Sequence, residues 1–277
     1  MEYSPKKFQE QFEKYGFNLK KMYGQNFIID ENIINNIINK AQIDKDTLVI
    51  EIGPGAGSLT NKLCKNAKNV ICYEIDTTLK EILEKNIEDE NIEIIYKDFL
   101  KCNVNDDIKK YDYNKLYVVA NLPYYITTPI ITKIIEENVP VNKMVIMVQK
   151  EVGDRFKAKP NSREYNSLSI YLDYYFDVRK ILDISKNVFI PKPNVDSIVL
   201  ELNSKENKYN LKNKSLFFKL VKDSFKQKRK TIKNNLKGYN MDIIEKILLK
   251  NNFNLSSRAE QIPIEVFVEI SNSLEKN

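Results

Sequence analysis

Short runs of apolar residues recur along the first two-thirds of the chain, and stretches long enough for a helix separate them. Each run is about as long as a buried strand, and strands that alternate with helices are typical of βαβ units. We therefore predict an α/β fold with a mostly parallel sheet. The expected strands are residues 47–52, 70–74, 92–96, 116–120 and 144–148, with later candidates at 175–181 and 197–202.

Helical spacing of apolar residues characterises both ends of the chain. Ser4, Pro5 and the aromatic residues that follow predict a short helix over residues 4–16. Three further helices are expected at residues 216–236, 241–251 and 264–274. Residues 204–214 are polar and have little to bury, so we expect a domain boundary there. The prediction is a domain of residues 1–204 followed by a small all-α domain of residues 205–277.

The composition removes several kinds of chemistry. The chain has no His and no Trp, which excludes Ser-His-Asp and Cys-His nucleophile pairs and His-ligated metals. Cys64, Cys72 and Cys102 lack CxxC spacing, so we expect reduced thiols and no metal site. No apolar stretch approaches the ~18 residues of a membrane span, and the N-terminus lacks the apolar region of a leader peptide. We expect a cytoplasmic protein that does not bind a membrane.

Positive charge is concentrated in the C-terminal quarter. The chain carries a net charge of +6, and residues 205–277 contain 16 Lys and Arg against 8 Asp and Glu. Lys226, Arg229, Lys230 and Lys233 recur at helical spacing, which predicts one basic stripe on a helix. Such a stripe suits the phosphates of a nucleic acid, although a Lys-rich solvated surface would have the same composition.

A glycine-rich turn follows the first predicted strand. Gly53, Gly55 and Gly57 would let the backbone approach a ligand closely, and the helix that follows offers free N–H groups. The spacing is GxGxG, not the dinucleotide fingerprint, which favours a nucleoside cofactor without a pyrophosphate. Glu74 ends the next strand, where a carboxylate can bind ribose hydroxyls, and Asp98 is placed to reach an adenine. A purely structural turn is the alternative.

A second motif, Asn121-Leu122-Pro123-Tyr124, follows the fourth predicted strand. The carboxyl ends of parallel strands border the ligand crevice, so this loop would face the glycine turn. The Asn121 oxygen and a backbone carbonyl of Leu122 or Pro123 could accept both N–H bonds of an adenine amine and direct its lone pair at an electrophile. Tyr124 would stack on a flipped base. The alternative is a Pro-containing turn with Asn as a helix cap.

Together these residues resemble the S-adenosylmethionine-dependent methyltransferases, and specifically the ribosomal RNA adenine N6,N6-dimethyltransferases. Residues 23–28 (YGQNFI) and 189–197 (FIPKPNVDS) are similar to two further segments of that family. The resemblance implies a Rossmann-like class I methyltransferase sheet and S-adenosylmethionine as cofactor. It also implies a set of cofactor-binding residues: Asn26, Ile28, Gly53, Glu74, Asp98 and Asn121, of which Asn26 and Ile28 rest on the resemblance alone. We add Gly55 because it belongs to the same turn.

The C-terminal residues distinguish two branches of the family. Residues 225–236 (FKQKRKTIKNNL) and 258–261 (RAEQ) resemble the branch that dimethylates two adjacent adenines of small-subunit (16S) ribosomal RNA. That resemblance implies the small ribosomal subunit as partner and a role in its biogenesis, and we expect a monomer. The alternatives are a macrolide-resistance enzyme acting on large-subunit RNA, a DNA adenine methyltransferase, a nicotinamide dehydrogenase, and a non-catalytic RNA-binding assembly factor.

Overall fold

The computed structural model describes residue 10, residues 25–206 and residues 209–275. Apart from Glu10, the helix predicted for residues 4–16 lies outside this described part. The chain forms two compact units: one comprises residues up to Gly153 together with Arg179–Ser204, and the other comprises Asp154–Val178 together with the residues from Lys205 onward. The sequence predicts a single boundary at residue 204, whereas in the structure residues 154–178 also belong with the C-terminal residues.

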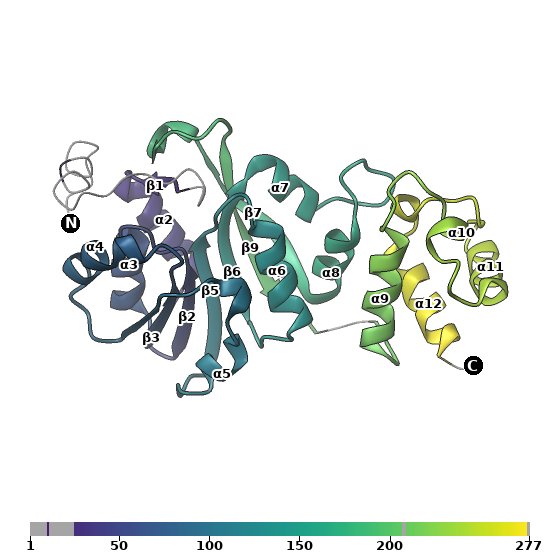
Figure 1. Ribbon diagram of the computed structural model, residues 1–277, viewed down its shortest axis with the longest axis horizontal. Coiled ribbons are helices and arrows are strands. Elements are labelled where there is room, and N and C mark those ends of the chain that lie inside the picture. Colours follow the sequence, from purple (N-terminus) through teal and green to yellow (C-terminus); the bar gives the residue numbers. More distant parts are fainter. Residues whose placement is uncertain (1–9, 11–24, 207–208, 276–277) are drawn as a thin grey trace. The chain divides into compact units, whose positions relative to one another are not determined.

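A seven-stranded mixed sheet forms the centre of the first unit, in the order β4-β3-β2-β5-β6-β9-β7 (Figure 1). The strands from β4 to β6 are parallel, and β9 pairs antiparallel with β6. All six residues of β2 are buried, so both faces of the sheet are covered. The bounds are β2 Thr47–Ile52, β3 Asn69–Tyr73, β4 Ile92–Ile95, β5 Lys115–Asn121, β6 Lys143–Gln149, β7 Phe176–Ile184 and β9 Ser197–Ser204.

Helices connect the parallel strands as the spacing of the apolar runs predicts. The helix α2 begins after Asp30, whose carboxylate accepts the N–H of Asn32 at 2.9 Å, and its buried isoleucines join the sheet core. Other elements of this part are α3 Ser58–Asn66, η2 Thr77–Leu79, α4 Lys80–Asn86, η3 Phe99–Lys101, α5 Val104–Ile108, α6 Thr127–Glu136, α7 Lys150–Phe156 and η4 Lys186–Val188, with α2 at Glu31–Ala41.

Two very short strands form a second sheet beside the first. β1 (Phe27–Ile28) pairs antiparallel with β8 (Phe189–Ile190). This pairing joins residues 23–28 to residues 189–197, the two further segments that resemble the family. Phe27, Ile28 and Phe189 are all buried, so the pairing also closes apolar surface near the glycine turn.

The second unit is helical, and aromatic contacts hold it together. α8 (Ser167–Tyr175) packs on α9 (Lys214–Ser224) through Tyr171 and Phe218, whose ring centroids are 4.8 Å apart, and the Tyr171 hydroxyl donates to the Phe218 carbonyl at 3.0 Å. The remaining elements are α10 Ile232–Asn235, α11 Met241–Lys250, η5 Ala259–Gln261 and α12 Ile264–Leu274. No helix in the described ranges is long and apolar enough to span a bilayer.

The single helix expected over residues 216–236 is wrong, because α9 and α10 are separated by a loop. Residues 226–230 are all exposed and polar, so no apolar side chain continues the buried face of α9 through them. The Asn235 amide closes the loop by donating to the carbonyls of Ser224 and Gln227 at 2.6 and 3.2 Å. Ile232 restarts the buried face in α10.

Candidate active site

The glycine turn after β2 is held in a conformation that side chains disfavour. Gly53 and Gly55 have φ of 74° and 60°, in the left-handed region. A Cβ atom on Gly55 would lie 2.9 Å from the Phe27 ring, so this turn also depends on a close approach to β1. The arrangement leaves the backbone of the turn lining a pocket at the start of α3.

Glu74 lies directly after β3 and faces the glycine turn. One carboxylate oxygen accepts the Asp76 N–H at 2.7 Å and the other accepts the Gly55 N–H at 3.4 Å. Glu74 is only 4% exposed, and burial raises the pKa of its carboxyl to about 7. Gln25 donates to Asp76 at 2.8 Å, which fixes the same turn. A carboxylate accepts up to four hydrogen bonds, so Glu74 retains capacity for ligand hydroxyls.

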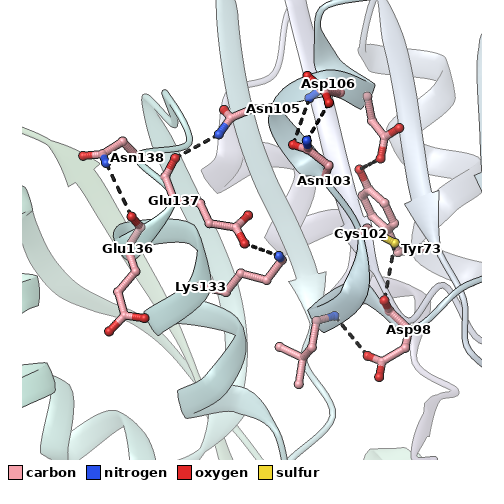
Figure 2. A network of polar contacts seen from close by, with 12 residues as sticks. Tyr73, Asp98, Cys102, Asn103, Asn105, Asp106, Lys133, Glu136, Glu137 and Asn138 are labelled. Atoms are coloured by element: carbon pink, nitrogen blue, oxygen red, sulfur yellow. Dashed lines mark hydrogen bonds and ion pairs between the residues drawn. The ribbon is translucent and has the colours of Figure 1, made fainter.

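Asp98 follows β4 and lines the same pocket. Its carboxylate caps η3 by accepting the Leu100 N–H at 3.0 Å, and the Cys102 thiol donates to its carbonyl at 3.3 Å (Figure 2). The Tyr73 hydroxyl donates to Asp107 at 3.0 Å, and its ring packs edge-on against Phe99. These contacts hold the turn that carries Asp98 from two sides.

Asn121 ends β5 and presents two groups with different roles. Its amide nitrogen donates to the Asn26 carbonyl at 2.9 Å, which joins the loop to the β1 segment. Its amide oxygen is buried and has no hydrogen-bond partner among the described residues. Leaving a buried acceptor unsatisfied costs ~1–3 kcal/mol, so this oxygen is suited to receive a donor from a ligand.

The backbone of the same loop is also ordered by hydrogen bonds. The Leu122 N–H donates to the Met147 carbonyl at 3.1 Å. The Pro123 carbonyl accepts both the Ile126 N–H at 3.2 Å and the Thr127 hydroxyl at 3.1 Å. Since the Pro123 carbonyl is engaged twice, the Leu122 carbonyl is the better candidate for a second acceptor toward a ligand.

The Tyr124 ring is tethered through its hydroxyl. That hydroxyl lies 2.6 Å from the Ser197 hydroxyl at the start of β9. Ser197 is 1% exposed, and burial raises the pKa of the Tyr124 phenol. Because Ser197 is held in the sheet opposite Gln149 of β6, it fixes one end of the aromatic ring relative to the strand ends.

The pocket brings together every residue predicted to bind a cofactor or act on a substrate. It contains about 940 Å³ of empty space, part of which is open to solvent. The predicted residues that line it are Asn26, Ile28, Gly53, Gly55, Glu74, Asp98, Asn121, Leu122, Pro123 and Tyr124. A cavity with a close-approach glycine turn, buried carboxylates and an unpaired amide oxygen fits a nucleoside cofactor beside a second planar ligand.

Sequence reasoning missed several residues of this site. Phe27 and Phe99 line the pocket and supply apolar surface, although each stands next to a residue that was predicted, Asn26 or Asp98. Glu51 also lines the pocket and is not a solvated carboxylate: it is 1% exposed, accepts the Cys72 thiol at 3.4 Å, and burial raises the pKa of its carboxyl to about 7.

The predicted basic stripe does not exist as a stripe. Lys226, Arg229 and Lys230 lie in the loop between α9 and α10, and only Lys233 lies in a helix. The helical spacing therefore does not set their directions, because the exposed loop breaks the helix. All four side chains are nevertheless exposed.

One family and two named relatives match most of the chain. The family described as ribosomal RNA adenine dimethylase matches residues 16–276. A Bacillus pumilus (strain SAFR-032) protein named ribosomal RNA small subunit methyltransferase A is 44% identical over 99% of this chain and 97% of its own length. A Staphylococcus aureus (strain bovine RF122 / ET3-1) protein of the same name is 47% identical over 86% of this chain and 82% of its own length.

Two solved structures share the fold. A dimethyladenosine transferase from Plasmodium falciparum superposes with a TM-score of 0.70 at 25% identity, over 88% of this chain and 95% of that one. The 23S rRNA methyltransferase ErmE superposes with a TM-score of 0.64 at 23% identity, over 90% of this chain and 99% of that one, and supports the fold alone. From the family match along nearly the whole chain, this protein belongs to the ribosomal RNA adenine dimethylase family, whose methyl donor is S-adenosylmethionine.

Proposed function

We propose that this protein transfers methyl groups from S-adenosylmethionine to N6 of two adjacent adenines in the 3′-terminal hairpin loop of small-subunit ribosomal RNA. The observation that carries the proposal is the buried, unpartnered oxygen of Asn121 at the head of the Asn-Leu-Pro-Tyr loop. Such an acceptor suits an exocyclic amine, which brings two N–H donors and needs them held. Family membership and the names of the two relatives support the substrate class.

The chain's own residues would orient the target amine. The Asn121 oxygen and the Leu122 carbonyl accept its two N–H bonds, which turns the nitrogen lone pair toward the electrophile. Tyr124, tethered to Ser197, stacks on the flipped base. When bound, S-adenosylmethionine supplies the methyl group. The amine proton lost on transfer can pass to solvent, so a chain without His needs no general base.

The cofactor half of the pocket would be formed by the glycine turn and two carboxylates. Glu74 would bind the ribose hydroxyls and Asp98 the adenine; both line the pocket beside the Gly53 and Gly55 backbone. Asn26 and Ile28 would complete this half from β1. The Asn121 amide nitrogen donates to the Asn26 carbonyl, so this hydrogen bond links the cofactor half of the pocket to the substrate half.

We assign methyl transfer to the domain of residues 1–204 and RNA binding to that of residues 205–277, with residues 154–178 packed in the second unit. Lys226, Arg229, Lys230 and Lys233 are the proposed RNA contacts, and their exposure supports this role. The proposal includes a monomeric enzyme that works in the cytoplasm, where small subunits assemble, and that binds no membrane.

The test is transfer of labelled methyl groups to four substrates in parallel: unmethylated small subunits, large subunits, naked ribosomal RNA and duplex DNA. We expect label only in small-subunit particles, recovered as N6,N6-dimethyladenosine. Label in large-subunit RNA would instead assign the protein to the macrolide-resistance branch. Binding of cofactor without any transfer would contradict the proposed activity.

A further inference from the structure

Residues 155–163 form a second exposed basic segment, which the charge count along the sequence did not reveal. Arg155, Lys157, Lys159 and Arg163 are all exposed, and no acidic residue lies among them. The segment follows β6 in the chain, far from the C-terminal quarter where the basic excess was expected. In the structure it belongs to the same compact unit as the C-terminal helices.

Three contacts hold this segment against the C-terminal part of the second unit. The Lys228 ammonium donates to the Arg163 carbonyl at 2.7 Å. The Asn161 N–H donates to the Glu260 carbonyl at 2.8 Å. Tyr165, which is 4% exposed, packs edge-on against Phe225 with ring centroids 6.1 Å apart. Residues 155–163 therefore lie beside the loop that begins at Phe225.

The basic loop itself is held by the chain on its other side. Besides the Asn235 bonds that close it, the Ile232 N–H donates to the Ser257 carbonyl at 2.8 Å and the Lys233 N–H donates to the Leu255 carbonyl at 3.1 Å. Both segments make backbone contacts with residues 255–260, and the Lys228 side chain bonds directly to Arg163, so residues 155–163 and 226–237 are neighbouring parts of one surface. Their cations come from segments about 70 residues apart in the chain.

The two segments themselves carry only positive charge, and the exposed Asp154 and Glu164 flank the first of them. Residues 155–163 and 226–237 together carry ten Lys and Arg and no Asp or Glu. None of the ten forms an ion pair with another residue in the described ranges. Ten cations without an ion-pair partner attract a polyanion, and binding is favourable because it releases the counterions of that polyanion.

The chemistry of the surface favours RNA as the polyanion. A membrane surface would also attract cations, but binding in its interface needs large apolar side chains that insert. The large exposed apolar residues of the described chain are Ile75, Tyr125 and Leu249, and none belongs to the two segments. A surface of cations without apolar anchors suits the phosphate backbone of a folded RNA.

We propose that residues 155–163 and 226–237 form one RNA-binding surface and that Lys157, Lys159 and Arg163 contact RNA phosphates together with the C-terminal loop. The inference rests on the proposed function and adds to it, because it assigns part of the RNA contact to residues outside the predicted C-terminal domain. It implies that the part of the second unit formed by residues 154–178 serves substrate binding as well as packing.

The test compares two triple variants of the full-length protein with equal loss of charge. The first is Lys157→Gln, Lys159→Gln, Arg163→Gln. The control is Lys40→Gln, Lys65→Gln, Lys219→Gln, which removes three exposed cations outside the surface. Binding to unmethylated small subunits is measured from 50 to 300 mM salt, with S-adenosylmethionine affinity and thermal unfolding measured on the same samples.

For the first variant we expect roughly tenfold weaker binding at 150 mM salt and a slope of log K against log salt lower by ~2–3, since each lost phosphate contact lowers it by nearly one. Cofactor affinity and unfolding temperature should match the control. Equal slopes in the two variants, with normal binding by the parent, would overturn this inference alone. Failure of the parent protein to bind or methylate small subunits would overturn the proposed function as well.

Discussion

At the scale of single residues, the role proposed for the Asn121 amide oxygen predicts that its loss affects the chemical step much more than cofactor binding. This oxygen has no hydrogen-bond partner within the described residues, whereas the Asn121 amide nitrogen already donates to the Asn26 carbonyl. We expect Asn121→Ala to lower kcat about 100-fold, because one hydrogen bond in the reacting geometry is worth ~3 kcal/mol. The affinity for S-adenosylmethionine, measured by calorimetry, should change only a few fold.

A matched control for that variant is Asn105→Ala. The Asn105 amide donates to the Glu137 carbonyl at 2.8 Å (Figure 2), and neither residue lines the pocket. This variant should keep the parental kcat. If Asn121→Ala methylated small subunits as fast as the parent, Asn121 would have no part in the mechanism.

The hydrogen bond between Tyr124 and Ser197 predicts that Ser197 positions the stacking ring. Ser197→Ala should lower kcat about fivefold, since a hydrogen bond of ~1 kcal/mol is lost, and leave the KM for S-adenosylmethionine unchanged. Tyr124→Phe should have a similar effect, and the double variant should be no worse than either single one. Ser197→Thr, which keeps the hydroxyl, should restore most of the rate. Additive losses in the double variant would show that the two residues act independently.

Site residues that belong to a short sequence motif could be predicted, whereas contacts between residues far apart in the chain could not. Glu74, Gly55 and Asn121 could be predicted because each belongs to a short motif at a strand end, where the βαβ rule already places ligand contacts. The link between Tyr124 and Ser197 could not, since the residues are 73 positions apart and meet only through the register of β9 against β6.

At the scale of elements, long buried strands were predictable and short or broken elements were not. The parallel strands are continuous apolar runs because both faces of the sheet are covered, so β2, β5 and β6 agree with the predicted strands to within two residues. The strands β1 and β8 have two residues each, too few to show any periodicity. The break between α9 and α10 was not predicted, because the lysines between them recur at helical spacing although no buried apolar face accompanies them.

The same break predicts an effect of Asn235 on the basic loop. Asn235→Ala removes two hydrogen bonds to the carbonyls of Ser224 and Gln227, leaving polar groups unpaired. We expect the free energy of unfolding in urea to fall by about 1–2 kcal/mol and binding to small subunits to weaken, with S-adenosylmethionine affinity unchanged. The exposed neighbour Asn234, whose amide donates to the Thr231 hydroxyl at 3.1 Å, provides the control variant Asn234→Ala. Equal stability of the two variants would contradict the role given to Asn235.

At the scale of the whole molecule, buried carboxyls make stability depend on pH. Burial raises the pKa of the Glu51 carboxyl from 4.5 to about 7, with a smaller contribution from the nearby Glu74 charge. The Cys72 thiol that faces Glu51 has its pKa raised well above 9 by burial, so it stays protonated over this range. Below pH 4.5 Glu51 is neutral in both folded and unfolded chains and burying it carries no charge penalty. As the pH rises through 7, the folded state loses that advantage.

We therefore expect Glu51→Gln to gain stability relative to the parent as the pH rises. Each unit of pKa shift corresponds to ~1.36 kcal/mol, so the difference in unfolding free energy between variant and parent should move by roughly 2 kcal/mol in favour of the variant from pH 5 to pH 8. Urea unfolding at the two pH values measures it. The exposed Glu88 gives the control Glu88→Gln, whose difference from the parent should stay constant. A constant difference for Glu51→Gln would mean that this carboxyl has the same pKa in the folded and unfolded chains. The effect of burial on its pKa would then have to be cancelled by a hydrogen-bond or charge partner other than the Cys72 thiol.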